Sequence, residues 1–269
     1  NCNNWGSIFF IFNFLHKTYT LMTKIILNKI NFDIGKKNIL SDINILFRTG
    51  TLTGIVGPNG SGKTTILKII SNILNSYSGT ISYDNLDYRK YKRLDLAKNI
   101  SYLPQEMTIA WPLSVYNIVM AGLTSFSDME LNYNERDYRI NSVLEELNLK
   151  EFASISINKL STGERSRACL ARALVSKPNF LLADEPVSSL DPYYQLNILN
   201  LILERVRSGM GAIIIMHDLD LARRYCDNIV VIQDGVVVSN DRPDISLDNK
   251  NLKKIFAVEY DENKLILSE

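Results

Sequence analysis

The stretch GPNGSGKT, from Gly57 to Thr64, decides the fold of this chain. It fits the pattern GxxxxGK[ST], and its surroundings match too, because the apolar run TLTGIV precedes it and a helical pattern follows to about Leu74. In such a strand–loop–helix unit the glycines let backbone N–H groups curve around phosphate oxygens, Lys63 bridges the β- and γ-phosphates, and Thr64 holds Mg²⁺. The alternative is a glycine-rich turn with a chance lysine, which the flanking strand and helix disfavour.

The runs on either side of this loop predict an α/β protein. Apolar, β-branched runs bounded by turn residues predict further strands at 24–32, 42–47, 80–83, 100–103, 180–183, 212–216 and 229–232. Helix-length segments separate the later strands, which favours a mainly parallel central sheet with covering helices, joined to an N-terminal antiparallel β part. Between 114 and 152 the apolar residues follow helical spacing, and we expect a helical insert over about 106–176.

Bulk composition restricts the class of protein. Of 269 residues, 46% are apolar and 22% are charged, and 30 basic against 29 acidic residues leave a net charge of +1. A nucleic-acid-binding protein usually carries a basic excess, so we expect no nucleic-acid partner. The cysteines have no paired spacing and form no metal-ligand pattern with the two histidines, which favours a reducing compartment.

The first 21 residues are unlike the rest. SIFFIFNFL, from Ser7 to Leu15, is shorter than the roughly 18–20 residues of a membrane-spanning helix and lacks the features of a signal peptide. The chain also begins with Asn1, and we expect Met22 to be the native start. We therefore interpret 1–21 as a leader or disordered extension and 22–269 as the folded domain. An amphipathic membrane anchor is the alternative.

Polar residues with catalytic chemistry follow several predicted strands. FLLADEP (180–186) ends a buried strand with Asp184, suited to Mg²⁺, and Glu185, which can accept a proton from water. Two acids after an apolar run are otherwise a solvated strand end. His217 closes AIIIMH and is by itself more often a core or capping residue, while Gln105 in YLPQE is by itself a surface residue. A catalytic role for His217 or Gln105 is supported only when all the motifs are considered together.

The run KLSTGERSRACLARAL, from Lys159 to Leu174, has two interpretations. Ser161 followed three residues later by Glu164 is a capping box, which starts a helix. The same helix terminus offers free N–H groups and a positive dipole end to a phosphate.

The chain closely resembles the ATPase subunit of ATP-binding cassette (ABC) transporters. The resemblance rests on the order of its motifs, which are the phosphate loop, Gln105, the helical insert, LSTGE, FLLADEP, SSLD and MHD. The likeness extends from about Lys24 to Phe256 and implies a P-loop NTPase fold that hydrolyses ATP with Mg²⁺. It assigns ATP-phosphate binding to the loop residues Gly57, Pro58, Asn59, Gly60, Ser61, Gly62, Lys63, Thr64 and Thr65.

The same resemblance implies the other roles. Asp184 and Thr64 hold Mg²⁺, Glu185 is the general base, and His217 contacts the γ-phosphate. Gln105 senses Mg²⁺ and the attacking water. Four residues form the signature that binds ATP held on a second copy: Ser161, Thr162, Gly163 and Glu164. Asp191 belongs to the loop that joins the two sites of the dimer.

Two positions depart from the family pattern. Ile34 stands where an aromatic residue usually stacks on adenine, and we expect Phe32 to face away from it. Thr162 stands where glycine is commonest, which adds a Cβ beside the phosphate.

The later stretches resemble the ATPases of importers for iron–siderophore complexes, haem or cobalamin. The resemblance implies a homodimer or a pair with a similar ATPase, integral membrane permease subunits, an indirect link to a solute-binding protein, and a place on the cytoplasmic face of the plasma or inner membrane. In that family the segment MTIAWPLSVYNIVMAGLTSF receives a permease helix. Trp111, Val115, Ile118 and Val119 are otherwise core residues, and an exposed subset would mark the docking patch.

Alternatives in function remain open. One is an ABC ATPase for metal ions or another small solute. Another is a non-transport ABC ATPase acting in translation or DNA repair, although the chain has no room for tandem cassettes or a long coiled coil. A small-molecule kinase or GTPase would leave LSTGE and SSLD without a role.

Overall fold

The computed structural model describes residues 22–105, 107, 111–188, 190–261 and 264–268, and the predicted leader 1–21 lies outside the described residues. Its centre is a six-stranded sheet in the order β10-β9-β3-β8-β7-β6, and neighbouring strands are parallel except that β10 pairs antiparallel with β9. The strands are β3 (Leu52–Val56), β6 (Ile100–Leu103), β7 (Phe180–Asp184), β8 (Gly211–Ile215), β9 (Asn228–Gln233) and β10 (Val236–Asp241). The predicted parallel sheet is confirmed.

The inner strands of this sheet are buried on both faces. All five residues of β7 are buried, and their side chains alternate between two hydrophobic cores: Phe180 and Leu182 belong to one, Leu181 and Ala183 to the other. Successive side chains of a strand point to opposite faces, so a strand covered on both sides is apolar throughout. This is why these strands appear in the sequence as continuous apolar runs.

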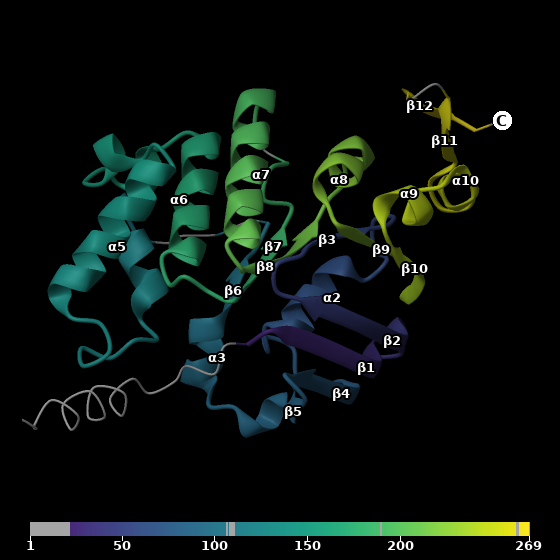
Figure 1. Cartoon of the computed structure of the whole chain (residues 1–269), viewed down its shortest axis with the longest axis horizontal. Helices are drawn as coiled ribbons and strands as arrows, with labels where there is room; N and C mark the ends of the chain where they lie inside the picture. Colours follow the sequence, from purple (N-terminus) through teal and green to yellow (C-terminus); the bar gives the residue numbers. More distant parts are fainter. Residues whose placement is uncertain (1–21, 106, 108–110, 189, 262–263, 269) are drawn as a thin grey trace, which may run out of the picture.

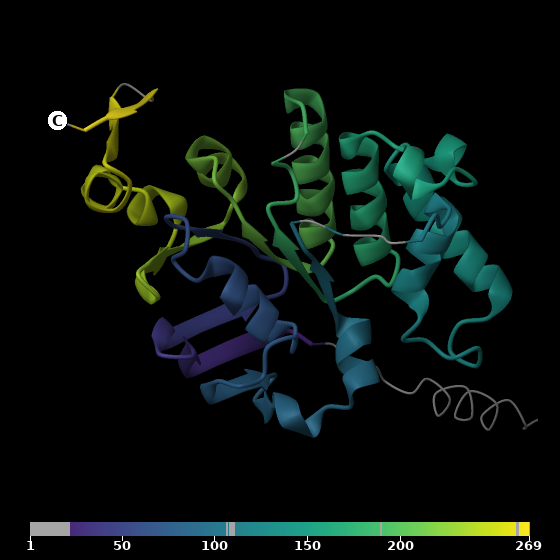
Figure 2. The ribbon, with the colours of Figure 1, turned by 180° about the vertical axis from the view of Figure 1, so that it is seen from behind.

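One core lies between the central sheet and an antiparallel sheet with strand order β2-β1-β4-β5. These strands are β1 (Lys24–Ile34), β2 (Lys37–Arg48), β4 (Ser78–Tyr83) and β5 (Leu86–Asp87). Helix α2 (Lys63–Ile70) contributes Ile66, Leu67, Ile69 and Ile70 to the same core, and Figure 2 shows it beside β1 and β2. Helix α2 ends before the predicted Leu74, because Asn72 has a positive φ of 59°.

The other core lies under a layer of helices that Figure 1 shows along the opposite side of the sheet. The segment between β6 and β7 contains α4 (Val115–Met120), α5 (Tyr133–Glu146) and α6 (Thr162–Leu174), with short 3-10 turns η2 (Ala121–Leu123), η3 (Lys150–Phe152) and η4 (Ile157–Lys159). The helical character predicted for 114–152 is confirmed. Helices α7 (Pro192–Arg207) and α8 (Leu219–Tyr225) complete this layer.

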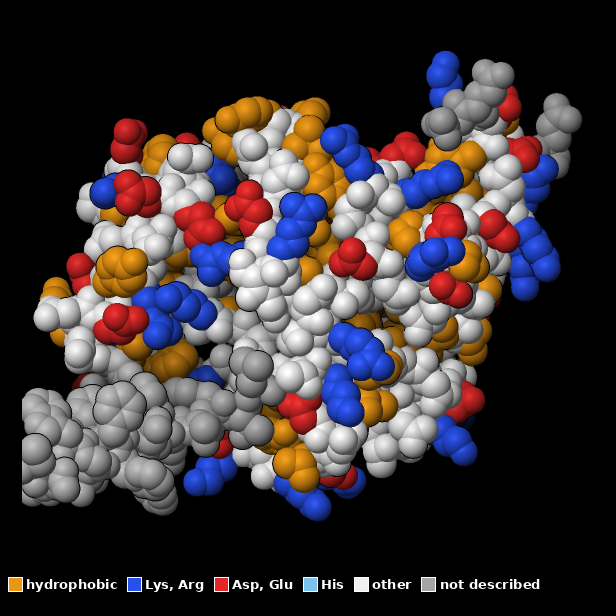
Figure 3. All heavy atoms as spheres, viewed as in Figure 1, with side chains coloured by type: hydrophobic (Ala, Val, Ile, Leu, Met, Phe, Trp, Pro, Cys, Tyr) orange, Lys and Arg blue, Asp and Glu red, His pale blue; other side chains and the backbone are white. Residues whose placement is uncertain are grey.

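Smaller elements border the two layers. The turn η1 (Tyr88–Lys90) and helix α3 (Arg93–Asn99) connect β5 to β6, and the chain ends in α9 (Pro243–Ser246), α10 (Asn249–Phe256) and the hairpin β11 (Val258–Asp261) and β12 (Lys264–Leu267). Within the described part of the chain, no helix is long and apolar enough to cross a membrane. Acidic and basic side chains are interspersed over the face drawn in Figure 3.

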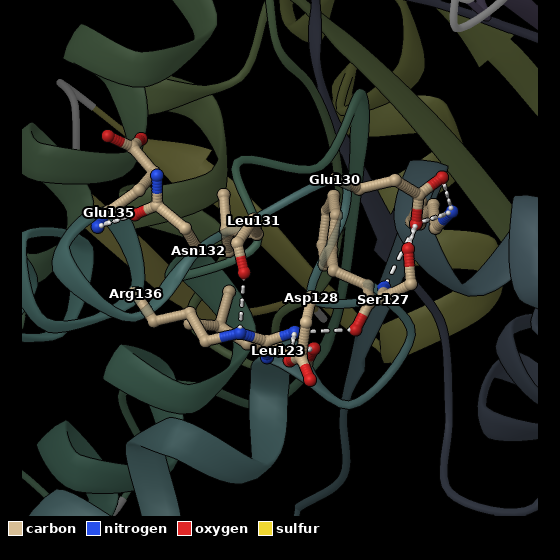
Figure 4. A network of polar contacts seen from close by, with 10 residues as sticks. Leu123, Ser127, Asp128, Glu130, Leu131, Asn132, Glu135 and Arg136 are labelled. Atoms are coloured by element: carbon tan, nitrogen blue, oxygen red, sulfur yellow. Dashed lines mark hydrogen bonds and ion pairs between the residues drawn. The ribbon is translucent and has the colours of Figure 1, made fainter.

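A polar network fixes the loop before α5 (Figure 4). Arg136 donates to the carbonyl oxygens of Leu131 at 2.8 Å, Leu123 at 3.3 Å and Phe126 at 2.7 Å. Glu130 accepts hydrogen bonds from Ser127 and from the buried ammonium of Lys98 on α3 at 2.7 Å. The helical segment is thereby tied both to its own turns and to the strand side of the protein.

We expect Arg136→Met to lower the free energy of unfolding by about 2–3 kcal/mol, because three carbonyl groups lose a charged donor. Urea denaturation monitored by circular dichroism measures this. Arg242→Met is the matched control: its ion pair with Asp244 is 3.4 Å long and exposed, so its removal should change stability by less than about 0.5 kcal/mol. Equal unfolding midpoints for the two variants would contradict the structural role of Arg136.

Candidate nucleotide site

The predicted ATP-site residues follow four strands of the central sheet at the same edge. The phosphate loop follows β3, Gln105 follows β6, Asp184 and Glu185 end β7, and His217 follows β8. Strands β3, β8, β7 and β6 are consecutive and parallel, so their carboxyl ends meet. Ligands of open α/β sheets bind at this edge. The topology therefore brings together residues that are up to 160 positions apart, from Gly57 to His217.

Lys63, the first residue of α2, turns back onto its own loop. Its ammonium donates to the carbonyl oxygens of Gly57 at 2.8 Å and Pro58 at 2.9 Å, and the side chain is buried. Burial lowers the pKa of Lys63, and the nearby carboxylates of Glu185 and Asp184 act in the opposite direction. An incoming phosphate would give this poorly solvated cation a stronger partner than two carbonyls.

Two glycines are required by the course of the loop. A Cβ on Gly57 would lie 2.0 Å from the carbonyl oxygen of Ile232 on β9. Gly62 caps α2 with a φ of 100°, and a Cβ there would lie 2.6 Å from Leu40 on β2. Only glycine accepts both the positive φ and the close neighbours. The loop is thus held between the antiparallel sheet and the central sheet, which leaves its backbone N–H groups in a defined position.

Asp184 has the features of a cation ligand. Its side chain is 2% exposed, and its Oδ1 has no hydrogen-bond partner among the described residues. Burial raises the pKa of Asp184, and a hydrogen bond with Thr64 lowers it. The buried hydroxyl of Ser61 also lacks a partner in the described part of the chain. Buried oxygens without partners are costly unless a ligand satisfies them, and oxygen donors suit Mg²⁺.

Glu185 lies between the two other predicted catalytic side chains. Its Oε2 accepts a hydrogen bond from Nε2 of Gln105 at 2.7 Å, and its Oε1 is 2.5 Å from Nε2 of His217. Glu185 has a φ of 52°, a conformation that costs about 1–3 kcal/mol for a residue with a side chain and is found mainly at functional sites. The turn directs its carboxylate away from the line of β7 and towards the ends of the neighbouring strands.

The capping box of the LSTGE run is confirmed. Ser161 caps α6 and its hydroxyl accepts from the backbone N–H of Glu164 at 3.3 Å, while the Glu164 carboxylate accepts from the backbone N–H of Ser161 at 2.8 Å. These hydrogen bonds from Ser161 lower the pKa of Glu164. Ser161, Gly163 and Glu164 line a surface pocket of about 200 Å³ together with Asp191, and no residue of the phosphate loop lines it.

Phe32 does not take the place of the aromatic ring that is missing at Ile34, the position where an aromatic residue usually stacks on adenine. Ile34 ends β1 with 61% of its surface exposed, whereas Phe32 is buried in the core. Ile34 is exposed because it is the last residue of β1, next to the turn into β2, whereas Phe32 lies two residues further inside the strand. As expected, Phe32 offers no ring to a base.

The comparisons with known proteins identify the family. The family model described as ABC transporter matches residues 40–188. An uncharacterized ABC transporter ATP-binding protein of Methanocaldococcus jannaschii is 35% identical over 237 residues, which cover 87% of this chain and 92% of that protein. This chain belongs to the ABC transporter family. It is an ATP-hydrolysing subunit of a transporter.

Other similar proteins also carry names of ATP-binding subunits of transporters, or are solved structures of such subunits. The hemin import ATP-binding protein HmuV of Shewanella denitrificans is 33% identical, covering 86% of this chain and 92% of its own, and HmuV of Rhizobium etli is 36% identical, covering 83% and 87%. The structure of cbiO1 from Clostridium perfringens, part of the ABC transporter complex cbiONQ, matches with a TM-score of 0.73 at 28% identity over 87% of this chain and 94% of that one. An ATP-binding subunit of an ABC transporter matches in fold with a TM-score of 0.75 at 23% identity over 83% of this chain and 91% of its own.

The structure adds residues to the site that the sequence patterns did not mark. Ile39 and Leu40 support the phosphate loop from β2, and Arg167 and Tyr194 line the pocket at the start of α6. Arg167 lies three residues after Glu164, one helical turn further on, which is a signal that spacing could have provided. Tyr194 could not be found in this way, since it is on a different helix.

We expect Lys63→Met to weaken ATP binding by about 100-fold or more, because the β- and γ-phosphates lose their buried cation. Isothermal titration calorimetry measures the affinity. Lys90→Met, at an exposed position in η1, serves as the control for loss of a positive charge and should bind ATP as the wild type does. Unchanged affinity in Lys63→Met would refute the role of this lysine.

Proposed function

We propose that this ABC ATPase drives an importer: two copies close on ATP and act on membrane-embedded permease subunits, with an iron–siderophore complex, haem or cobalamin as cargo. An ABC transporter for a metal ion or another small solute is the alternative. The proposal places the protein at the cytoplasmic face of the membrane, attached through the permease, which in turn receives cargo from a solute-binding protein.

The proposal of a dimer rests on one observation: the phosphate loop and the signature, which are the two groups of predicted ATP-binding residues, lie apart in a single copy. Helix α2, which begins at the phosphate loop, packs in the core on one face of the central sheet, and α6, which begins at the signature, packs in the core on the other face. Ser161 and Gly163 therefore line a pocket apart from the loop of their own chain. ATP on the phosphate loop reaches a signature only if a second copy supplies it.

Within each proposed site the side chains have different roles. The phosphate loop and Lys63 hold the phosphates, and Glu185 is the base that accepts a proton from the attacking water. His217 and Gln105 both contact Glu185 and so orient its carboxylate. In the structure Gln105 contacts Oε2 and His217 contacts Oε1, and each carboxylate oxygen can still accept a hydrogen bond from the attacking water.

Asp184, Thr64 and Gln105 are the residues that would hold Mg²⁺. The unpartnered Oδ1 of Asp184 and its hydrogen bond with Thr64 support this assignment. When bound, Mg²⁺ neutralises charge on the β- and γ-phosphate oxygens. The metal would also satisfy the buried carboxylate oxygen that the protein leaves unpaired.

The segment after Gln105 supplies a surface for the permease. Val115, Ile118 and Val119 are buried in the core, which confirms the packing interpretation for these three. Among the described residues of the segment, the large apolar side chains that are exposed are Trp111 at 74%, Leu113 at 40% and Met120 at 43%. We call these three the docking patch, and we propose that a short cytoplasmic helix of the permease binds there, since exposed apolar side chains can mark interaction sites.

Import and the class of cargo rest on similarity. Several relatives at 32–36% identity carry the name hemin import ATP-binding protein. The same resemblance in ADEPVSSLDPYYQL and in the segment from Gly209 to Val238 supports importers of iron–siderophore complexes, haem or cobalamin.

Glu185→Gln should bind ATP without hydrolysing it and should accumulate as an ATP-bound dimer, because the base is lost while charge repulsion at the γ-phosphate falls. Size-exclusion chromatography with light scattering in ATP measures the mass. Glu151→Gln, an exposed glutamate of η3, is the matched control and should hydrolyse ATP normally. A Glu185→Gln variant that binds ATP and stays monomeric would count against the two-copy site.

Ser161→Ala separates the two roles of the signature serine. The lost helix cap should lower the free energy of unfolding by about 1 kcal/mol, and the lost contact to ATP on the second copy should also lower ATPase activity. Asn132→Ala removes an equivalent cap, whose side chain accepts from Glu135 at 3.0 Å on α5, and should cost similar stability with normal activity. If both variants retain full ATPase activity in the assembled transporter, Ser161 is only a cap.

A further inference from the structure

Helices α6 and α7 are joined by a stacked pair at the pocket that holds the signature. The guanidinium carbon of Arg167 on α6 lies 4.2 Å from the centre of the Tyr194 ring on α7. Both side chains line the pocket of about 200 Å³ with Ser161, Gly163, Glu164 and Asp191. The pair therefore lies between the signature and the Asp191 loop, the two segments that would face the second copy in the proposed dimer.

Arg167 is buried against this ring. It is 6% exposed, and its Nε has no hydrogen-bond partner among the described residues. A guanidinium is flat and weakly hydrated, so an aromatic face can replace part of its lost solvation. Its charge also acts on the Glu164 carboxylate, as one of the influences that lower the pKa of that group. Arg167 is thus in contact with α7 while its field reaches the cap of α6.

Tyr194 is in turn fixed to the loop that ends in Asp191. Asp191 caps α7, and its carboxylate accepts a hydrogen bond from the backbone N–H of Tyr194 at 3.1 Å. The neighbouring Leu190 lines the same pocket as Gly163, and a Cβ added to this glycine would be 3.4 Å from the Leu190 Cδ2. The stacked pair consequently connects α6 to α7 near the two helix starts that line this pocket.

We propose that the Arg167–Tyr194 pair positions Ser161 and Asp191 as one rigid unit, so that both reach the nucleotide site of a second copy in fixed register. The inference rests on the proposed ATP-dependent dimer. Arg167 and Tyr194 are positioning residues, which act through the helix caps and do not touch nucleotide. Tyr193, the adjacent residue, is 69% exposed, and its ring packs edge-on against Tyr194 at 5.3 Å between ring centres, whereas Arg167 stacks on Tyr194; Tyr193 therefore provides a matched comparison.

The test uses the full chain in the Glu185→Gln background. Analytical ultracentrifugation in ATP measures the dimer dissociation constant, and calorimetry with ADP measures the affinity of the phosphate loop of the single copy. Tyr194→Leu should weaken ATP-dependent dimerisation by about tenfold and leave ADP affinity unchanged, since a desolvated cation–ring contact is lost at each of the two sites. Tyr194→Phe keeps the ring, and Tyr193→Leu keeps the pair, so both should dimerise like the parent.

Other outcomes overturn the inference. If the parent dimerises in ATP and Tyr194→Leu dimerises equally well, the pair has no positioning role although the proposed function stands. If Tyr193→Leu loses as much as Tyr194→Leu, or if ADP affinity falls in parallel, the effect is a general disturbance of α7. If the parent itself stays monomeric in ATP, the proposed function fails, and the inference fails with it.

Discussion

The placement of the phosphate loop between two sheets is the constraint on which the rest of the structure depends. The loop must present convergent backbone N–H groups, and it does so by bending through Gly57 and Gly62 at conformations that leave no space for a Cβ. The carbonyl of Ile232 and the side chain of Leu40 set those limits from β9 and β2. The parallel sheet and the antiparallel sheet are therefore both needed to shape one loop of eight residues, Gly57 to Thr64.

The buried charges of the candidate site also favour binding of a phosphate and a divalent cation. Lys63 is buried with only carbonyl partners in hydrogen-bonding contact, and Asp184 is buried with one oxygen unpartnered among the described residues. Burial lowers the pKa of the first group and raises that of the second, so in each case the protein disfavours the charged form. Opposite charges supplied by a phosphate and a divalent cation would relieve both. Such unsatisfied groups are where folding stability is given up for ligand binding.

In the proposed dimer, the helix caps on the other half of the protein would have a double function. The free N–H groups at the start of α6 and α7 are satisfied by Ser161, Glu164 and Asp191. The same ends line the pocket that the proposed dimer would place over a second nucleotide. A capping box and a phosphate-binding terminus are thus compatible in one stretch, because both use the same unpaired donors. The stack of Arg167 on Tyr194 links the two ends.

The sequence by itself determined the fold class, and it predicted the residues of the candidate site. Continuous apolar runs marked the parallel strands, since strands covered on both faces have no polar side, and the short-range patterns GPNGSGKT, FLLADEP and LSTGE marked loops whose chemistry is local. Tertiary structure alone decided what depends on contacts between distant segments. It separated exposed Trp111 from buried Val115 and exposed Ile34 from buried Phe32, and it brought Arg167 to Tyr194. Periodicity within one segment cannot report these features, because each depends on which other segment packs against it.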